Sequence, residues 1–228
     1  MLVTRAEPGA SETAARIAAM GHSVIVAPML VIEPVAANAD TTRVQALLFT
    51  SANGVAAFAR ETTERALPVF CVGDATGEAA TANGFGNVRI AGGDVRALAP
   101  FVAQSLRPEA GPLLHVGGAD LAGDLVGALQ REGFTAERRV FYRAVLVRQL
   151  PQEARDALRG SIDVVMFHSA RGCAAFSDAI GKDADLQRIA ALCLSPAVAE
   201  IARLMQWRDV VVAQAPREDA LLRLLVEN

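Results

Sequence analysis

The chain contains two copies of one pattern, and this internal repeat constrains its fold more than any other feature. Phe49–Ala59 reads FTSANGVAAFA and Phe167–Ser177 reads FHSARGCAAFS, with seven of eleven positions identical. Residues 69–80 match residues 191–202 in pattern, and residues 2–28 correspond more loosely to residues 113–140. Repeats of this size are domains, since solenoid units repeat roughly every 20–50 residues. We therefore expect two similar lobes, with the repeated loops facing a cleft between them.

Composition excludes several classes of protein. Hydrophobic residues make up 52% and charged residues 21% of the 228 positions, as in an ordinary globular protein. The longest apolar run, residues 24–32, includes Pro28 and falls well short of the ~20 residues that span a bilayer. The N-terminus lacks the basic and apolar regions of a signal peptide, so we expect a cytoplasmic protein. Cys71, Cys173 and Cys193 are too few and too scattered for a disulfide framework or a zinc site.

The charge balance gives one further indication. The net charge of −3 argues against a nucleic-acid-binding or membrane-binding surface. Of the 22 basic residues only Lys182 is a lysine, and arginine holds carboxylates in bidentate pairs better than lysine does. A GC-rich coding sequence gives the same bias, so only individual arginines in loops are informative.

Strand-like and helix-like segments alternate along the chain. Continuous apolar strands separated by helices indicate α/β lobes, each with a parallel sheet flanked by helices. Ligand-binding loops in such folds follow the carboxyl ends of the strands. Strands are expected at 1–4, 23–28, 44–50, 68–73, 87–91, 112–116, 134–141, 162–168, 191–195 and 209–214. Helices are expected at 8–20, 51–64, 74–83, 94–106, 121–132, from 169, at 196–205 and at 217–226.

Small polar residues gather where the repeated strands end. Ser51 and Ser169 each precede a helix, and the simplest interpretation is that their hydroxyls cap it. An open helix N-terminus also presents N–H groups to an anion, so the duplicated turns are compatible with a multiply anionic ligand. The chain has no G-x-G-x-x-G, no phosphate loop and no G-x-S-x-G elbow. Chemistry here is therefore expected to need neither metal nor nucleotide.

The order of these motifs resembles uroporphyrinogen-III synthase. The motifs are TR after the first strand, FTSANGV, VGDAT, FYRAV at 141–145, F-x-S-x-x-G and a Ser-Pro turn. The resemblance covers essentially the whole chain and implies two flavodoxin-like lobes joined by two extended linkers, 29–37 and 141–148. One lobe would combine residues 1–34 with 147–228, and the other would contain 38–142. The bare repeat alone would suggest a simple tandem division near Ala110.

The resemblance also implies a reaction. The family cyclises hydroxymethylbilane, a linear tetrapyrrole with eight carboxylates, with loss of water and inversion of the terminal ring. It implies a lyase without a cofactor. It further implies a monomer with a transient contact to the preceding pathway enzyme, acting on neither nucleic acid nor membrane.

Site residues follow from the same resemblance. Tyr142, the single tyrosine, matches the family's cleft tyrosine and is expected to assist loss of the hydroxyl; alternatively it packs on the linker with its hydroxyl exposed. The expected substrate-binding residues are Arg5, Ser51, Ala52, Asn53, Gly118, His168, Ser169, Ala170 and Ser195.

The chain departs from the family pattern at three places. His168 stands where members often have Thr, Ala197 and Val198 replace two Thr residues, and Val116-Gly117 precedes Gly118 where an Arg-Gly pair is common. These changes leave open a divergent member of the family with altered or reduced activity. Two alternatives to the enzyme also remain: a non-catalytic two-lobed binding protein for a small polyanionic ligand, and a degenerate interaction or regulatory module.

Overall fold

The chain divides into two compact units. The structure, a computed structural model, describes residues 1–93, 95–120, 123–180 and 185–226. Unit 1 combines Met1–Val31 with Val145–Asn228, and unit 2 is the continuous segment Ile32–Ala144. Within the described residues no helix is long and apolar enough to cross a membrane.

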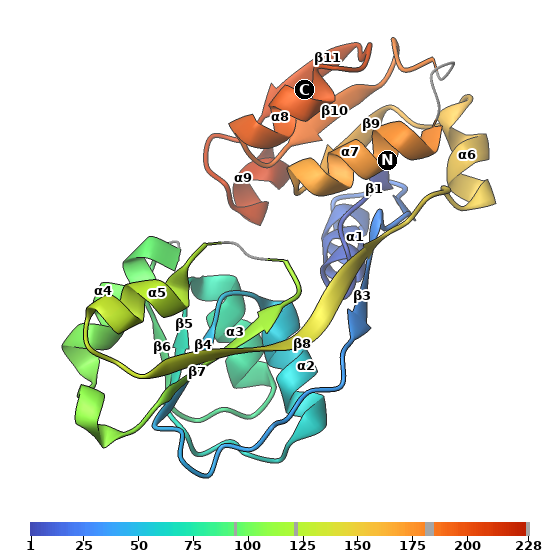
Figure 1. The fold of residues 1–228 in the computed structure, drawn as a ribbon. Helices are drawn as coiled ribbons and strands as arrows, with labels where there is room; N and C mark the ends of the chain where they lie inside the picture. Colours follow the sequence, from blue (N-terminus) through green and yellow to red (C-terminus); the bar gives the residue numbers. More distant parts are fainter. Residues whose placement is uncertain (94, 121–122, 181–184, 227–228) are drawn as a thin grey trace. The chain divides into compact units, whose positions relative to one another are not determined.

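Unit 1 has a five-stranded parallel sheet in the order β11-β10-β9-β1-β2. The blue N-terminal strands therefore lie in one sheet with the orange and red C-terminal strands (Figure 1). Its strands are β1 (Leu2–Val3), β2 (Ile25–Val26), β9 (Val164–Phe167), β10 (Ala190–Cys193) and β11 (Asp209–Val212). Its helices are α1 (Gly9–Ala19), α6 (Gln152–Leu158), α7 (Ala170–Ile180), α8 (Pro196–Ala202) and α9 (Glu218–Arg223).

The two faces of this sheet are covered by different helices. One core cluster contains Phe167 and Phe176 and joins the sheet to α6, α7 and α8. The other contains Ile17 and Leu221 and joins it to α1 and α9. Both faces are apolar because helices bury both, which explains the continuous apolar runs in the sequence.

Unit 2 has a six-stranded sheet in the order β3-β8-β7-β4-β5-β6. The core surrounding Phe49 and Phe58 lies under α2, whereas the core surrounding Leu48 and Leu98 lies under α4 and α5. The strands are β3 (Leu30–Pro34), β4 (Ala46–Phe49), β5 (Val69–Cys71), β6 (Val88–Ile90), β7 (Leu113–Gly118) and β8 (Ala136–Leu146). The helices are α2 (Ala52–Glu61), α3 (Asp74–Ala82), α4 (Val95–Ser105), a short 3₁₀ turn at Pro108–Ala110, and α5 (Leu125–Arg131).

The fold class expected from the sequence is confirmed. Numbering the strands of unit 1 along the chain gives the flavodoxin-like order 2-1-3-4-5. The parallel strands of unit 2, in the order β8-β7-β4-β5-β6, correspond in position to β2-β1-β9-β10-β11 of unit 1. The chain order differs, because β4, the first of these strands along the chain, takes the position of β9, the third strand of unit 1. The repeat in the sequence is therefore a repeat of topology.

One helix of unit 1 was not expected from the sequence. The segment between β8 and β9, expected to be irregular, contains α6, whose buried residues are only Ala154 and Ala157. This narrow apolar face gives little helical periodicity. The expected helix starts at Asp94 and Leu121 lie outside the described residues.

The three cysteines have no reactive environment. All are free and buried, and burial raises the pKa of Cys71 and Cys173 to about 12 and that of Cys193 to about 11. Such thiols stay protonated and pack as small apolar side chains.

Candidate functional site

Both units have a topological switch point, the place where ligands bind in open α/β sheets. In unit 1 it lies between β1 and β9, and in unit 2 between β7 and β4, because the strand order reverses there. The loops that follow these four strands carry most of the expected site residues. Unit 1 contains Arg5, His168, Ser169, Ala170 and Ser195; unit 2 contains Ser51, Ala52, Asn53, Gly118 and Tyr142.

In unit 2, Ser51 is the N-cap of α2. Its hydroxyl oxygen accepts a hydrogen bond from the Asn53 N–H at 3.1 Å, and its backbone is extended. Ala52 is the first residue of the helix, whose opening N–H groups have no partner inside the helix. The half-buried turn 51–53 therefore provides a helix N-terminus at the end of β4.

Tyr142 lies beside this turn. Its ring packs against Gly118, where an added Cβ would come within 2.7 Å of ring carbons Cε2 and Cζ. A Cβ added at Gly54, one residue beyond the Ser51–Asn53 turn, would lie 3.7 Å from ring carbon Cε1. The structure thus brings Tyr142, Gly118 and the start of α2 together.

His115 lies in the neighbouring strand of unit 2. It is 5% exposed, and its Nε2 lies 3.2 Å from the Thr50 hydroxyl. Burial, and then the charge of Arg138, lower the pKa of His115 to about 4. The ring is therefore neutral at pH 7 and packs close to the end of its strand.

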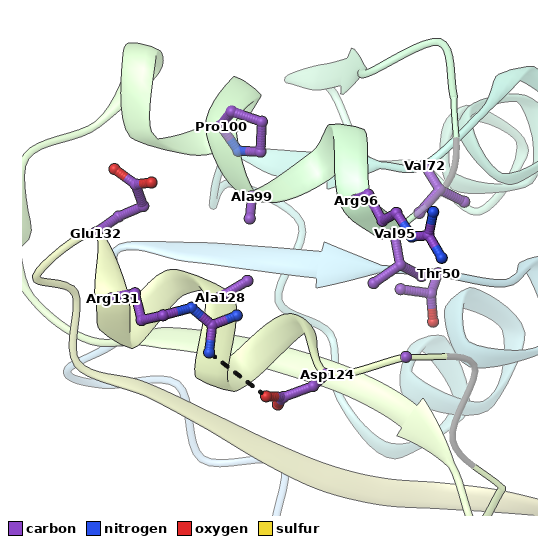
Figure 2. Close-up of a pocket in the computed structure, with 11 residues that line it drawn as sticks. Thr50, Val72, Val95, Arg96, Ala99, Pro100, Asp124, Ala128, Arg131 and Glu132 are labelled. Carbon is purple, nitrogen blue, oxygen red and sulfur yellow. Dashed lines mark ion pairs between the residues drawn. The ribbon is translucent and has the colours of Figure 1, made fainter.

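A pocket of about 850 Å³ lies at the ends of β4 and β5, beside α4 and α5 (Figure 2). Thr50 and Val72 follow β4 and β5, while the remaining walls come from α4, from α5 and from residues that directly precede and follow α5. Asp124 and Arg131 of this wall form an ion pair, with 3.9 Å between Asp124 Oδ2 and Arg131 Nη1. The lining residues are Thr50, Val72, Val95, Arg96, Ala99, Pro100, Gly123, Asp124, Ala128, Arg131 and Glu132.

In unit 1, Ser169 repeats the role of Ser51. Its hydroxyl accepts a hydrogen bond from the Gly172 N–H at 3.0 Å, and Ala170 is the first residue of α7. Ser195 differs: it precedes α8, but its side chain makes no capping bond and Pro196 occupies the first helical position. Of these three serines, Ser51 and Ser169 therefore cap a helix with the side-chain hydroxyl, and Ser195 does not.

Arg5 and His168 converge on Glu218, a residue that no sequence motif indicated. Arg5 Nη1 donates to Glu218 Oε2 at 3.0 Å, and His168 Nε2 donates to the same oxygen at 2.9 Å. The Thr13 hydroxyl donates to Oε1 at 2.6 Å. Glu218 opens α9, more than 200 residues from Arg5, so only the fold could reveal the cluster.

The groups that contact Glu218 strongly favour its ionised form. Burial alone would raise the pKa of Glu218, but the hydrogen bond and charge of His168, the Thr13 hydroxyl and Arg5 together lower it to about 2. The His168 side chain is 8% exposed and its Nδ1 has no hydrogen-bond partner among the described residues. Within the described part of the chain, Glu218 and Thr13 bond Arg5 through Nη1, while its Nε and Nη2 lie beside Gly9, where an added Cβ would come within 2.6 Å of both.

Comparison with known proteins identifies the family. A family model described as uroporphyrinogen-III synthase HemD matches residues 11–223. The fold is similar to a Helicobacter pylori uroporphyrinogen-III synthetase, with a TM-score of 0.69 and 16% identity over 99% of this chain and 98% of that one. A mutant uroporphyrinogen III synthase from Thermus thermophilus gives a TM-score of 0.54 and 16% identity over 99% and 97%. Comparison with curated protein sequences gives no match.

Proposed function

Because the chain belongs to the uroporphyrinogen-III synthase family, we propose that it cyclises hydroxymethylbilane to uroporphyrinogen III with loss of water and inversion of the terminal pyrrole ring. The match of the family model to residues 11–223, which cover all of unit 2 and most of unit 1, carries this proposal. The chain is accordingly an enzyme of tetrapyrrole synthesis that acts on a small-molecule tetrapyrrole.

The reaction is a lyase reaction that needs no cofactor. The hydroxyl group of the substrate departs with a proton as water and leaves an electrophilic azafulvene. The terminal ring then attacks through its substituted carbon, and the resulting spiro intermediate fragments and recloses with that ring inverted. Spontaneous closure proceeds without inversion, so the enzyme acts chiefly by folding the chain and stabilising charge.

Tyr142 is the residue we assign to departure of the hydroxyl. Its phenol sits at the carboxyl end of the unit 2 sheet, against Gly118 and near the N-terminus of α2. A proton donor at that point supports the first step.

Substrate carboxylates are assigned to the helix starts and to the unit 1 cations. The turn Ser51–Asn53 and the start of α7 at Ser169 and Ala170 present backbone N–H groups, which favour anions. Arg5 holds a carboxylate with the nitrogens that Glu218 leaves unused, and His168, whose Nε2 donates to the same Glu218 oxygen, supports that site through this contact. Ser195 has the weakest geometric support because its hydroxyl holds no helix start.

We expect a cytoplasmic monomer that binds neither nucleic acid nor membrane and contacts the preceding pathway enzyme transiently. Cell fractionation and sedimentation of the purified protein test the location and the oligomeric state.

The deciding experiment supplies freshly made hydroxymethylbilane and separates the uroporphyrinogen isomers chromatographically. The type III isomer is expected well above the type I isomer formed without protein. Type I alone, from a folded protein that binds the substrate, would identify a binding protein and overturn the enzymatic proposal.

A further inference from the structure

Two consecutive residues of β8 contact the same core cluster. Phe141 is 1% exposed and belongs to the core under α2, and Tyr142 packs against that same cluster. Consecutive side chains of a regular strand point to opposite faces of the sheet. Something in the strand therefore turns Tyr142 toward the α2 face.

A β-bulge provides that turn. Gly117 pairs with Val140, but the next residue, Gly118, pairs with Tyr142, so Phe141 is the extra residue. The Ala119 N–H then donates to the Tyr142 carbonyl at 2.8 Å, which fixes the strand beyond the bulge. Bulges re-aim side chains, and they are frequent next to active sites.

Gly118 supplies the space that the turned ring needs. Its Cβ would lie 2.7 Å from ring carbons Cε2 and Cζ and 3.0 Å from the phenol oxygen. Its φ lies outside the left-handed region, so the demand for glycine comes from space and not from backbone conformation. Gly117 differs, because a Cβ there would meet the Arg138 side chain, at 3.0 Å from Nε.

We propose that Gly118 is a positioning residue for Tyr142: its missing side chain and the bulge at Phe141 together form the seat of the phenol ring. The inference rests on the proposed function only for its effect on turnover. The position of the ring itself is measurable without any substrate.

The first test follows the ring directly. The chain has one tyrosine, so ring-¹³C-labelled tyrosine gives NMR signals from Tyr142 alone. Gly118→Ala should shift these signals, whereas the matched control Gly117→Ala should leave them near those of the unsubstituted chain. Unchanged Tyr142 signals in a folded Gly118→Ala variant would overturn the proposal.

The second test uses a double-mutant cycle. In the unsubstituted chain Gly118→Ala should lower kcat by about 10- to 100-fold, the range expected when a proton donor is misplaced, with little change in KM. In a Tyr142→Ala chain the same substitution should cost nothing further. An equal loss in both backgrounds would show that Gly118 does not act through the ring.

These outcomes separate the two proposals. If Gly118→Ala shifts the Tyr142 signals but leaves turnover unchanged, Gly118 positions the ring, and Tyr142 does not take part in the reaction. If Gly118→Ala fails to fold, the Tyr142→Ala/Gly118→Ala double variant decides: its recovery, measured by circular dichroism, would locate the clash at the ring. Continued failure to fold would refute the seat.

Discussion

Tyr142 is the residue whose substitution gives the sharpest expectation. Tyr142→Phe keeps the ring in its place against Gly118 and removes only the hydroxyl. We expect kcat to fall by about 100-fold or less, the low end for general acids, because azafulvene formation is intrinsically easy. KM and the type III product should persist, since inversion depends on how the substrate is folded. Initial rates and isomer ratios test this, and wild-type turnover would reduce the tyrosine to a packing residue.

The serine caps predict a graded response. Ser51→Ala and Ser169→Ala each remove a hydroxyl that accepts a helix N–H, which should cost about 1 kcal/mol of unfolding free energy. Turnover should fall only modestly, because the backbone N–H groups remain. Ser195→Ala is the matched control, since Ser195 makes no capping bond and should lose less stability. Complete inactivity of folded Ser51→Ala and Ser169→Ala would mean that the hydroxyls themselves hold the substrate.

The docking of α9 through Glu218 gives stability a dependence on acid pH. The folded pKa of Glu218 is about 2, below its ordinary value of 4.5, so the unfolded chain binds more protons between these values. The contribution is present above pH 4.5 and is lost as the pH falls toward 2. Urea unfolding across this window should show a smaller loss in Glu218→Gln than in the unsubstituted chain. Asp219→Asn, which removes the adjacent exposed carboxylate that pairs with Arg16, should keep the full loss; equal slopes for all three would contradict the assignment.

His115 in β7 acts in a higher pH window. Its folded pKa is about 4 against an ordinary value of 6.5, because burial disfavours the charged ring. The neutral ring therefore stabilises the fold above pH 6.5, and this contribution is lost as the pH falls through 6.5 toward 4. Replacing the ring by His115→Gln should flatten the unfolding free energy between pH 7 and 4.5. Parallel curves for the two proteins would show that His115 is accessible to protons in the folded state.

Elements were predictable from the sequence wherever a strand or helix has a strong pattern of its own. The buried strands Ala46–Phe49 and Val164–Phe167 and the capped helix α2 lie where apolar runs and Ser51 placed them. α6 was missed because it buries only Ala154 and Ala157, which give no clear helical pattern of apolar residues. β8 continues through Leu146 as a strand, whereas the sequence predicted a strand ending at residue 141 and an extended linker at 141–148.

The candidate site was predictable only in part. Strand ends and caps are local, so the sequence located Ser51 and Ser169 at helix starts. Glu218 meets Arg5 and His168 only because α9 packs beside α1, which no local signal reports. The seat of Tyr142 depends on a one-residue register shift between β7 and β8, and the sequence carries no pattern for it.

At the scale of the molecule, each unit has its own core. The two clusters of unit 2 contain only residues between Val44 and Phe141, and those of unit 1 lie outside that range. A fragment comprising residues 32–144 should therefore fold alone and unfold cooperatively in urea, followed by circular dichroism. Unit 1 should fold likewise when a short flexible linker replaces that segment, because the Val147 N–H donates to the Met29 carbonyl at 3.0 Å. A fragment without cooperative unfolding would show that the units depend on each other.

The pairing of β1 with β9 has a consequence for synthesis on the ribosome. Val3 is made before unit 2, yet one of its two partners in the sheet, Met166, follows only after all of unit 2 has been translated. The segment β1-α1-β2 must therefore wait, with its apolar face uncovered, while Ile32–Ala144 emerges and can fold first. Unit 2 can therefore complete its sheet before unit 1 does, and β1 meets β9 only after unit 2 has been made.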